Sequence, residues 1–209
     1  MALMDPELTV GLPAFWTLYT GLDALVHSVE SRTNRYRYAE NDSLAELSIQ
    51  HAAENLVQAV KEPDSIEART GMMLAAAYGG LAIANTGCAV AHNIGHALGS
   101  LAGIPHGRAV SVALAQTMHW TIDVNRDAFD RVGEMLGGKS ALDIEDRLHA
   151  LAQQCGESLS LSEEEKSKLS EQALADDMVA DANIAMLDAT ARDASRADVE
   201  HLAQRMLAA

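Results

Sequence analysis

Apolar residues recur at helical spacing through almost the whole of this chain, and that periodicity limits its fold more than any other feature. The clearest run advances in steps of three and four residues: Ala141, Ile144, Leu148, Leu151 and Cys155. Ser140 is the expected N-cap of this helix and Gly156 its stop. Alternating apolar and polar runs, which are typical of strands, are almost absent. The chain is therefore predicted to fold as an all-α, multi-helix bundle.

Eight segments have helical periodicity or composition. We expect helices over residues 20–30, 42–61, 66–84, 91–101, 128–136, 141–155, 176–187 and 198–207.

Caps and stops suggest where several of these helices begin and end. The second is expected to begin with Asn41, Asp42 or Ser43 as its N-cap. The third could be apolar all round, which indicates a buried helix. Residues 103–107 read GIPHG and are expected to form a loop. A capping box is expected later in the chain, with Ser162 and Glu165 ahead of Leu169 and Leu174.

The charge balance excludes several classes of partner. The formal net charge is −15, from 15 Lys and Arg against 30 Asp and Glu, and aromatic residues make up 4% of the chain. Binding nucleic-acid phosphates needs a basic face, and stacking on bases needs aromatic side chains. An anionic membrane surface likewise attracts basic segments. We therefore expect neither nucleic acid nor membrane as a partner.

No segment has the pattern of a membrane span or a signal peptide. The most apolar stretch, residues 72–91, is interrupted by polar residues and is interpreted as a buried core helix. Residues 1–7 contain acids and a proline where a signal peptide would be basic and then apolar. Two cysteines, Cys88 and Cys155, are too few for a disulfide-dense scaffold or a multi-cysteine metal cage. A cytoplasmic location is expected.

One segment matches a nucleotide-binding motif by chance. Residues 133–140 read GEMLGGKS and satisfy the phosphate-binding pattern GxxxxGK[ST]. A phosphate-binding loop of that type follows a buried strand, whereas Gly133 is expected inside an amphipathic helix between Phe129 and Leu136. Ser140 is expected to cap the next helix. We therefore predict no nucleotide hydrolysis at this segment.

The histidines carry the chemistry that the sequence suggests. Asp23 and His27 are four residues apart in a helical segment, so their side chains leave one face. His92 and His96 have the same spacing, and His106 follows in the loop. A carboxylate and several neutral imidazoles suit Zn²⁺ or Fe²⁺. Two helices and a loop could thus build a metal site inside a bundle.

Each of these signals has a structural alternative. A lone Asp-x-x-x-His pair is commonly a surface contact within one helix, and His92 and His96 could be satisfied polar groups in the core. The segment HNIGH lacks the glutamate of the HExxH motif, which disfavours a zincin-type protease. Four histidines lack partners at useful spacing and are interpreted as structural: His51, His119, His149 and His201.

At these residues the chain resembles the C-terminal, all-helical domain of the iron-containing (group III) alcohol dehydrogenases. The resemblance rests on DPELT at 5–9, GLP at 11–13, GLDALVHSVE at 21–30, AHNIGHALG at 91–99 and IPHG at 104–107. The order and spacing of these segments are as in the family. The resemblance implies a helical bundle of the dehydroquinate synthase-like type, extending over residues 1–209 as one metal-binding and catalytic domain.

The resemblance also implies roles for particular residues. It implies that Asp23, His27, His92 and His106 bind one divalent metal, Fe²⁺ first and Zn²⁺ as the other candidate. His96 matches the family histidine beside the nicotinamide, which makes it a catalytic and cofactor-binding residue rather than a ligand. NAD(P) would be bound by a domain absent from this chain. The implied substrate is a small alcohol or aldehyde, and a homodimer is the default assembly.

The chain also departs from the family. No glycine-rich GxGxxG turn follows a strand, and the chain begins where the family's Rossmann-like domain would end. Residues 191–195 read ARDAS where the family often has Asn-Pro-Arg. One alternative is a stand-alone metal-binding or partner-binding domain without dehydrogenase activity. Another is a non-redox enzyme of the dehydroquinate synthase type, which fits the histidine motifs less well.

Overall fold

The computed structural model describes residues 3–208, and in that range the chain forms α-helices and short 3-10 helices but no strand. The all-α prediction is therefore confirmed. The α-helices are α1 (Ala14–Thr33), α2 (Ala39–Lys61), α3 (Ile66–Thr86), α4 (Val90–Ala102), α5 (His106–Thr121), α6 (Arg126–Met135), α7 (Ile144–Gln154), α8 (Glu163–Ser167), α9 (Glu171–Met178), α10 (Ile184–Ala189) and α11 (Arg196–Ala208). The 3-10 helices are η1 (Pro6–Thr9), η2 (Ile122–Val124) and η3 (Ala141–Asp143).

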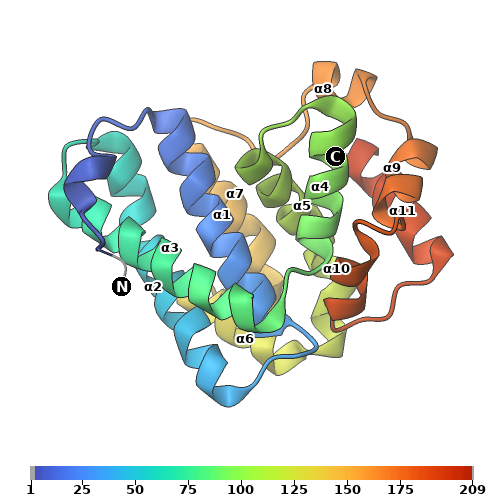
Figure 1. Ribbon diagram of the computed structural model, residues 1–209, viewed down its shortest axis with the longest axis horizontal. Coiled ribbons are helices and arrows are strands. Elements are labelled where there is room, and N and C mark those ends of the chain that lie inside the picture. The colour runs from blue at the N-terminus through green and yellow to red at the C-terminus, as the bar shows by residue number, and fades with distance from the viewer. Residues whose placement is uncertain (1–2, 209) are drawn as a thin grey trace.

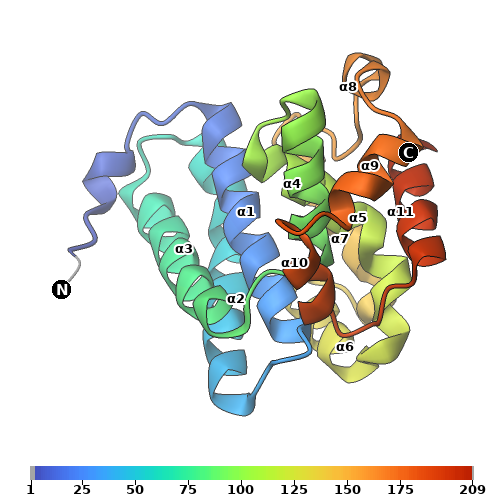
Figure 2. The same cartoon turned by 45° about the vertical axis from the view of Figure 1, so that its right-hand side comes forward.

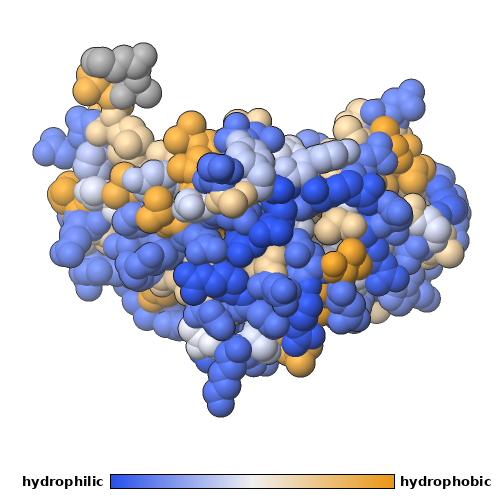
Figure 3. Space-filling view, turned by 90° about the horizontal axis from the view of Figure 1, so that it is seen from below, coloured by the Kyte–Doolittle hydropathy of each residue, from blue (hydrophilic) through white to orange (hydrophobic). Residues whose placement is uncertain are grey.

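Two groups of helices meet along α1 and α5. Helices α1, α2 and α3 pack against one another, while α4 packs along α5 (Figure 1). Helix α5 also contacts α1 and α7, and α9, α10 and α11 lie on the far side of α4 and α5 (Figure 2). One hydrophobic core runs through both groups. The face in Figure 3 is mostly hydrophilic, with hydrophobic side chains in separate small groups.

Several expected helix ends are confirmed. Ser140 and Asp143 form a capping box at η3, which leads into α7, and Gly156 has the positive φ of a helix stop. Ser162 and Glu165 form the second expected capping box, at α8. Gly137 likewise has positive φ just beyond α6. These ends were predictable because each depends on side chains only a few residues away.

The start of α2 differs from the prediction. The helix begins at Ala39 with Tyr38 as its N-cap, so the three predicted caps, Asn41, Asp42 and Ser43, all lie inside the helix. The Asn41 amide donates to Ser31 Oγ and to the Ala82 carbonyl, and Asp42 pairs with Arg37. Contacts to α1, to α3 and to the connection between α1 and α2, rather than capping, therefore explain these two polar residues.

Two predicted segments in the C-terminal third are interrupted. A continuous helix over 176–187 is wrong: α9 ends at Met178 and α10 begins at Ile184. Between them, the buried Asn183 side chain donates to the Asp177 carbonyl. Helix α8 also stops at Ser167, and Ser170 caps a new helix over Leu174. A polar side chain closes the turn in each break.

The predicted loop over 103–107 is too long. His106 and Gly107 are the first residues of α5, and only 103–105 form the connection. Helix α5 itself was not predicted. Its residues 109–118 are all buried, so it has no polar face to give its sequence a helical period.

Helix α3 is not buried all round, as the sequence suggested. Gly71, Ala75, Gly79 and Ala82 face the core, but Leu81 is 56% exposed. The apolar stretch 72–91 is also not one helix, because it breaks between α3 and α4. In residues 3–208 no single helix has the length and hydropathy of a membrane span. Helices α3 and α4 reach that composition only as a pair bent by 102°.

The GEMLGGKS segment does not form a phosphate-binding loop. Gly133 lies in α6, where an added Cβ would be 2.0 Å from the Ser140 carbonyl oxygen. The backbone N–H of Lys139 donates to Asp143 Oδ2, and that of Gly138 to the Gly133 carbonyl. The amides are thus already engaged within the chain, as the sequence interpretation of this segment requires.

Candidate metal centre

Helix α1 presents Asp23, His27 and Glu30 on one face, because steps of four and three residues return to the same side of a helix. The rest of the helix between them is buried, which fixes the direction of that face. Helix α4 contributes His92 and His96, and α5 begins with His106. Three separate helices therefore supply the side chains that the sequence singled out.

Asp23 Oδ1 lies at the centre of the group. The Nε2 atoms of His27, His92 and His106 are 3.8, 3.7 and 3.6 Å from this oxygen. In a tetrahedral site with metal–ligand bonds of about 2.1 Å, donor atoms are about 3.4 Å apart. The donor atoms of Asp23, His92 and His106 lie within 4.8 Å of one another, and His27 lies beside Asp23 at 3.8 Å, so the spacing approaches that of a ligand set. The structure brings together all four residues that the resemblance implied.

Two of these donor atoms are buried without a hydrogen-bond partner, Asp23 Oδ1 and His92 Nε2. Buried polar atoms are normally paired, since an unpaired one loses its interactions with water. A divalent cation between them would satisfy both. The donors are one carboxylate oxygen and imidazole nitrogens, which suit Fe²⁺ or Zn²⁺. The residues present therefore fit a metal of this class.

Glu30 holds His92 in place and was not singled out in the sequence. Its Oε2 atom is 2.7 Å from His92 Nδ1 and also accepts from the backbone N–H of Ala89. Its Oε1 atom accepts from the N–H of Ala91. Helix α4 has no side-chain cap of its own, so Glu30 caps it from α1. With Nδ1 occupied, His92 directs Nε2 toward Asp23.

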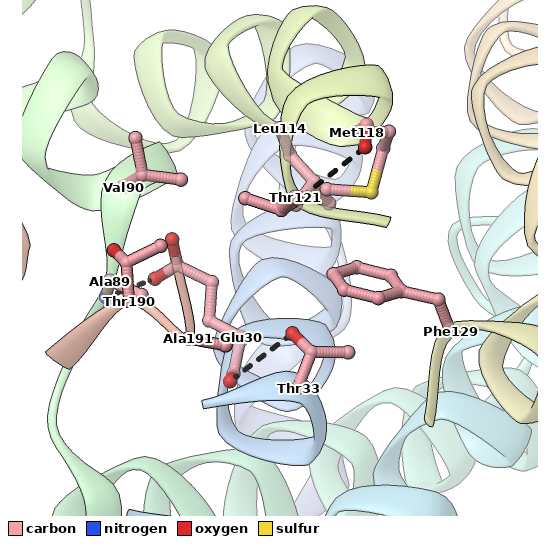
Figure 4. A pocket seen from close by; sticks show the side chains of 10 residues that line it. All are labelled: Glu30, Thr33, Ala89, Val90, Leu114, Met118, Thr121, Phe129, Thr190 and Ala191. Atoms are coloured by element: carbon pink, nitrogen blue, oxygen red, sulfur yellow. Dashed lines mark hydrogen bonds between the residues drawn. The ribbon is translucent and has the colours of Figure 1, made fainter. Parts of the chain in front are cut away.

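Figure 4 shows the surroundings of Glu30 on a cavity of 20 Å³, lined also by Thr33, Met118 and Thr121. A cavity needs roughly 10–15 Å³ to hold one water molecule. The Thr33 hydroxyl donates back to the Val29 carbonyl, so it leaves acceptor capacity toward this space. Most of the cavity lining is apolar, and its polar residues are Glu30, Thr33, Thr121 and Thr190.

The protonation of Asp23, His27 and His106 suits cation binding, whereas that of His92 opposes it. Burial raises the pKa of Asp23, but His92 and the charges of His27 and His106 outweigh it and lower the pKa. Burial lowers the pKa of His27 and of His106, which favours neutral rings with free lone pairs. Burial also lowers the pKa of His92, but the Glu30 carboxylate more than reverses this effect. A metal at His92 Nε2 would therefore have to displace a proton.

Close helix contacts set the position of His106 and His92. A Cβ on Gly107 would be 2.3 Å from the Tyr19 carbonyl oxygen, so only glycine lets α5 begin this near to α1. A Cβ on Gly95 would be 2.5 Å from Val110 Cγ1, so α4 and α5 also approach closely. These two contacts hold the three ligand-bearing helices together.

The group is closed on one side and open on the other. His92 is 1% exposed, whereas the His106 side chain is 48% exposed and His96 lies at the surface. The His96 and His106 ring centroids are 5.5 Å apart. His96 thus lies at the rim of the opening, apart from the convergence on Asp23.

The other histidines are elsewhere. His51 stacks on Tyr78, and His119 lies beside His201. Neither they nor His149 join a group of donors that could hold a metal within residues 3–208. A second donor group does occur, made of His27, Cys88 and His92. Cys88 was noted in the sequence only as one of two cysteines.

A model of the C-terminal region of the Fe-containing alcohol dehydrogenase family matches residues 17–207. The chain therefore belongs to the Fe-containing alcohol dehydrogenase family, as the sequence motifs indicated.

Individual relatives agree with this assignment. The chain is 33% identical over 151 residues to 1,3-propanediol dehydrogenase from Klebsiella pneumoniae, covering 70% of this chain and 39% of that protein. It is 32% identical over 137 residues to NAD-dependent methanol dehydrogenase from Bacillus methanolicus, covering 66% and 36%. A crystal structure of 1,3-propanediol oxidoreductase matches with a TM-score of 0.85 at 27% identity, covering 97% of this chain and 54% of that one. These matches span less than half of each curated relative and about half of the solved structure.

Proposed function

We propose that this chain is the metal-binding catalytic half of an NAD(P)-dependent alcohol dehydrogenase, with Asp23, His27, His92 and His106 as the ligands of one divalent cation. The observation that carries the proposal is the convergence of three imidazole nitrogens on Asp23 Oδ1, which is buried and without a hydrogen-bond partner. Family membership supports the same reaction class. Fe²⁺ is the first candidate and Zn²⁺ the second.

Each protein group has a physical task in this proposal. When bound, a divalent cation supplies Lewis acidity toward a substrate oxygen, and NAD(P) exchanges the hydride. Asp23 offsets part of the cation's charge, and Glu30 fixes the orientation of His92. The buried side of the group excludes water, so the small alcohol or aldehyde would approach past His106.

His96 is proposed to contact the nicotinamide or to pass a proton outward. Its place at the rim supports this, because it lies near His106 but outside the convergence on Asp23. In this proposal residues 1–209 form one helical domain located in the cytoplasm. A separate nucleotide-binding domain would hold NAD(P), and the domain would act on a small alcohol or aldehyde.

Metal analysis tests the ligand set. Protein purified without added metal should contain Fe or Zn, and His92→Ala should lose it. His149→Ala is the matched control, because His149 is a partly exposed histidine in α7 outside both donor groups. Metal at background in the unaltered protein, or metal retained by His92→Ala, would overturn the proposed centre.

A second measurement concerns turnover by the 209-residue chain alone. We expect it to fold, because a chain of this length buries about 70% of its unfolded surface. We expect no NADH formation from short-chain alcohols. No glycine-rich turn follows a strand in residues 3–208, so nothing there holds a pyrophosphate in the way dinucleotide-binding domains do. Turnover that disappears in His106→Ala would show that the chain binds the cofactor by itself.

A further inference from the structure

Cys88 lies beside the proposed centre in the short connection between α3 and α4. Gly87, with positive φ, turns the chain there, and the backbone N–H of Ala89 is tied to Glu30. Cys88 forms no disulfide and is partly buried. Its Sγ atom, one nitrogen of His27 and one nitrogen of His92 all lie within 4.8 Å of one another.

A histidine in the same donor group as the Cys88 thiol has a buried nitrogen without a hydrogen-bond partner. His92 Nε2 is buried and has no hydrogen-bond partner, while Nδ1 is held by Glu30. Nε2 is therefore the nitrogen left for a metal, and His92 belongs to both donor groups. One group adds Asp23 and His106, a carboxylate and an imidazole. The other adds His27 and Cys88, an imidazole and a thiol.

The two groups differ in chemical softness. Thiolates favour soft or borderline cations such as Zn²⁺ and Cd²⁺, whereas carboxylates favour harder ones such as Mn²⁺. We propose that Cys88 is an additional metal ligand, so that strongly thiophilic divalent cations such as Cd²⁺ bind His27, Cys88 and His92, while harder cations bind the proposed centre around Asp23. Because both sets share His92, one cation occupies one set at a time. Binding at Cys88 releases the thiol proton to solvent.

The inference rests on the proposed metal centre and deepens it, because it states how the centre distinguishes cations. It predicts that Cd²⁺ draws His27 and His92 away from Asp23, and so competes with a cation bound by the carboxylate. Softness would then decide which cation the protein retains from a mixture.

Cobalt spectroscopy tests the thiolate ligand directly. Co²⁺ added to the 209-residue protein should produce a near-ultraviolet thiolate-to-cobalt charge-transfer band. Cys155→Ser, which removes the other of the two cysteines, should keep the band, and Cys88→Ser should lose it. Cd²⁺ affinity should fall roughly tenfold or more in Cys88→Ser, while Mn²⁺ affinity stays within about twofold.

The outcomes separate this inference from the proposed function. Mn²⁺ binding without a cobalt–thiolate band would overturn the role of Cys88 and leave the centre at Asp23 intact. Absence of binding by any of these cations would overturn both. If Cys88→Ser fails to fold, alkylation of Cys155→Ser by iodoacetamide decides. Cd²⁺ should protect Cys88 at least roughly tenfold, also in the Asp23→Asn background, and equal rates with and without Cd²⁺ would refute the proposal.

Discussion

His92 is held by Glu30 from one side and faces Asp23 from the other. Glu30 lies on α1, one turn beyond His27, and its carboxylate also accepts backbone N–H groups at the start of α4. Negative charge at a helix N-terminus is favourable, so the pair couples the helix cap to the orientation of the imidazole. Burial raises the pKa of Glu30, but His92 and the backbone donors outweigh it and lower the pKa.

Replacing Glu30 with glutamine should weaken both functions of the residue. The neutral amide no longer stabilises a proton on His92 Nδ1, and one charge-assisted bond is lost. We expect metal affinity to fall roughly 10–100-fold and the free energy of unfolding by about 1–3 kcal/mol. Metal titration and urea unfolding measure the two effects. Glu54→Gln, at an exposed position on α2, should change neither. Unchanged metal affinity in Glu30→Gln would contradict the orienting role.

The sequence predicted the four candidate ligands but not their support. Asp23, His27, His92 and His106 are found by helical spacing and motif resemblance, and the structure places them together. Glu30 was named only as the last residue of a motif and was given no role. An acid three residues after His27 on a buried helix does indicate a buried carboxylate that needs a partner. Its partners lie about 60 residues further along the chain, so local spacing could not identify them. Cys88 was missed for the same reason.

At the scale of elements, the start of α5 determines where His106 lies. Gly107 follows it directly and touches the Tyr19 carbonyl on α1. In Gly107→Ala the new Cβ would overlap backbone, which has little freedom to move. We expect a loss of about 1–3 kcal/mol in the free energy of unfolding, together with weaker metal binding as α5 shifts.

Gly80→Ala is the control, and it should change the free energy of unfolding in the opposite direction to Gly107→Ala. Gly80 lies in α3 with open space around its added Cβ, so alanine should stabilise the protein by up to about 1 kcal/mol. Thermal unfolding and metal titration of the two variants check the comparison. Equal stability of Gly107→Ala and the unaltered protein would show that the contact between α1 and α5 is not tight.

Arg108 connects α5 to the segment that precedes α9. Its guanidinium donates to both carboxylate oxygens of Glu165 at 2.9 Å, to the Tyr19 hydroxyl, and to the carbonyls of Ser158 and Ser160. The hydrogen bonds from Arg108 lower the pKa of Glu165 to about 2. A carboxylate with a depressed folded pKa stabilises the protein above its unfolded value near 4.5.

This stabilisation should disappear as the pH falls from about 4.5 toward 2. Glu165→Gln should therefore cost about 1–2 kcal/mol at pH 7 and progressively less toward pH 3. Urea unfolding at a series of pH values measures the difference. Glu163→Gln, whose side chain is 92% exposed, should follow the unaltered protein at every pH. If the difference in the free energy of unfolding between Glu165→Gln and the unaltered protein is the same at every pH, the ion pair with Arg108 is not its cause.

Helices with one solvated face were predictable, and fully buried ones were not. Helices α6 and α7 alternate buried and exposed residues with helical period, and they end at glycines. Helix α5 has buried side chains on every face, so its sequence has no such period. The break between α9 and α10 depends on Asn183, whose neighbour across the fold is the buried Asn93 of α4. Tertiary contacts of this kind leave no local signal.

At the scale of the whole molecule, the candidate ligands join its two groups of helices. Asp23 and His27 come from α1, whereas His92 and His106 come from α4 and α5. A cation bound among them would link α1 to the pair formed by α4 and α5. It would also give Asp23 Oδ1 and His92 Nε2, which are buried without hydrogen-bond partners, a partner. Binding should therefore stabilise the native fold as well as prepare the site for chemistry.

Metal removal should lower the melting temperature of the 209-residue chain. A ligand at 100 times its Kd stabilises the native state by about 2.7 kcal/mol, which for a protein of this size corresponds to roughly 5–10 °C. Scanning calorimetry with Fe²⁺ or Zn²⁺, and again after chelation, measures the shift. His106→Ala should reduce this shift, because the substitution removes one of the proposed ligands. The His106 side chain is half-exposed, so the substitution should cost little core packing. The same shift in His106→Ala as in the unaltered protein would indicate that the stabilising cation binds elsewhere. Protons compete with the cation for the imidazoles, so the shift should also shrink as the pH falls.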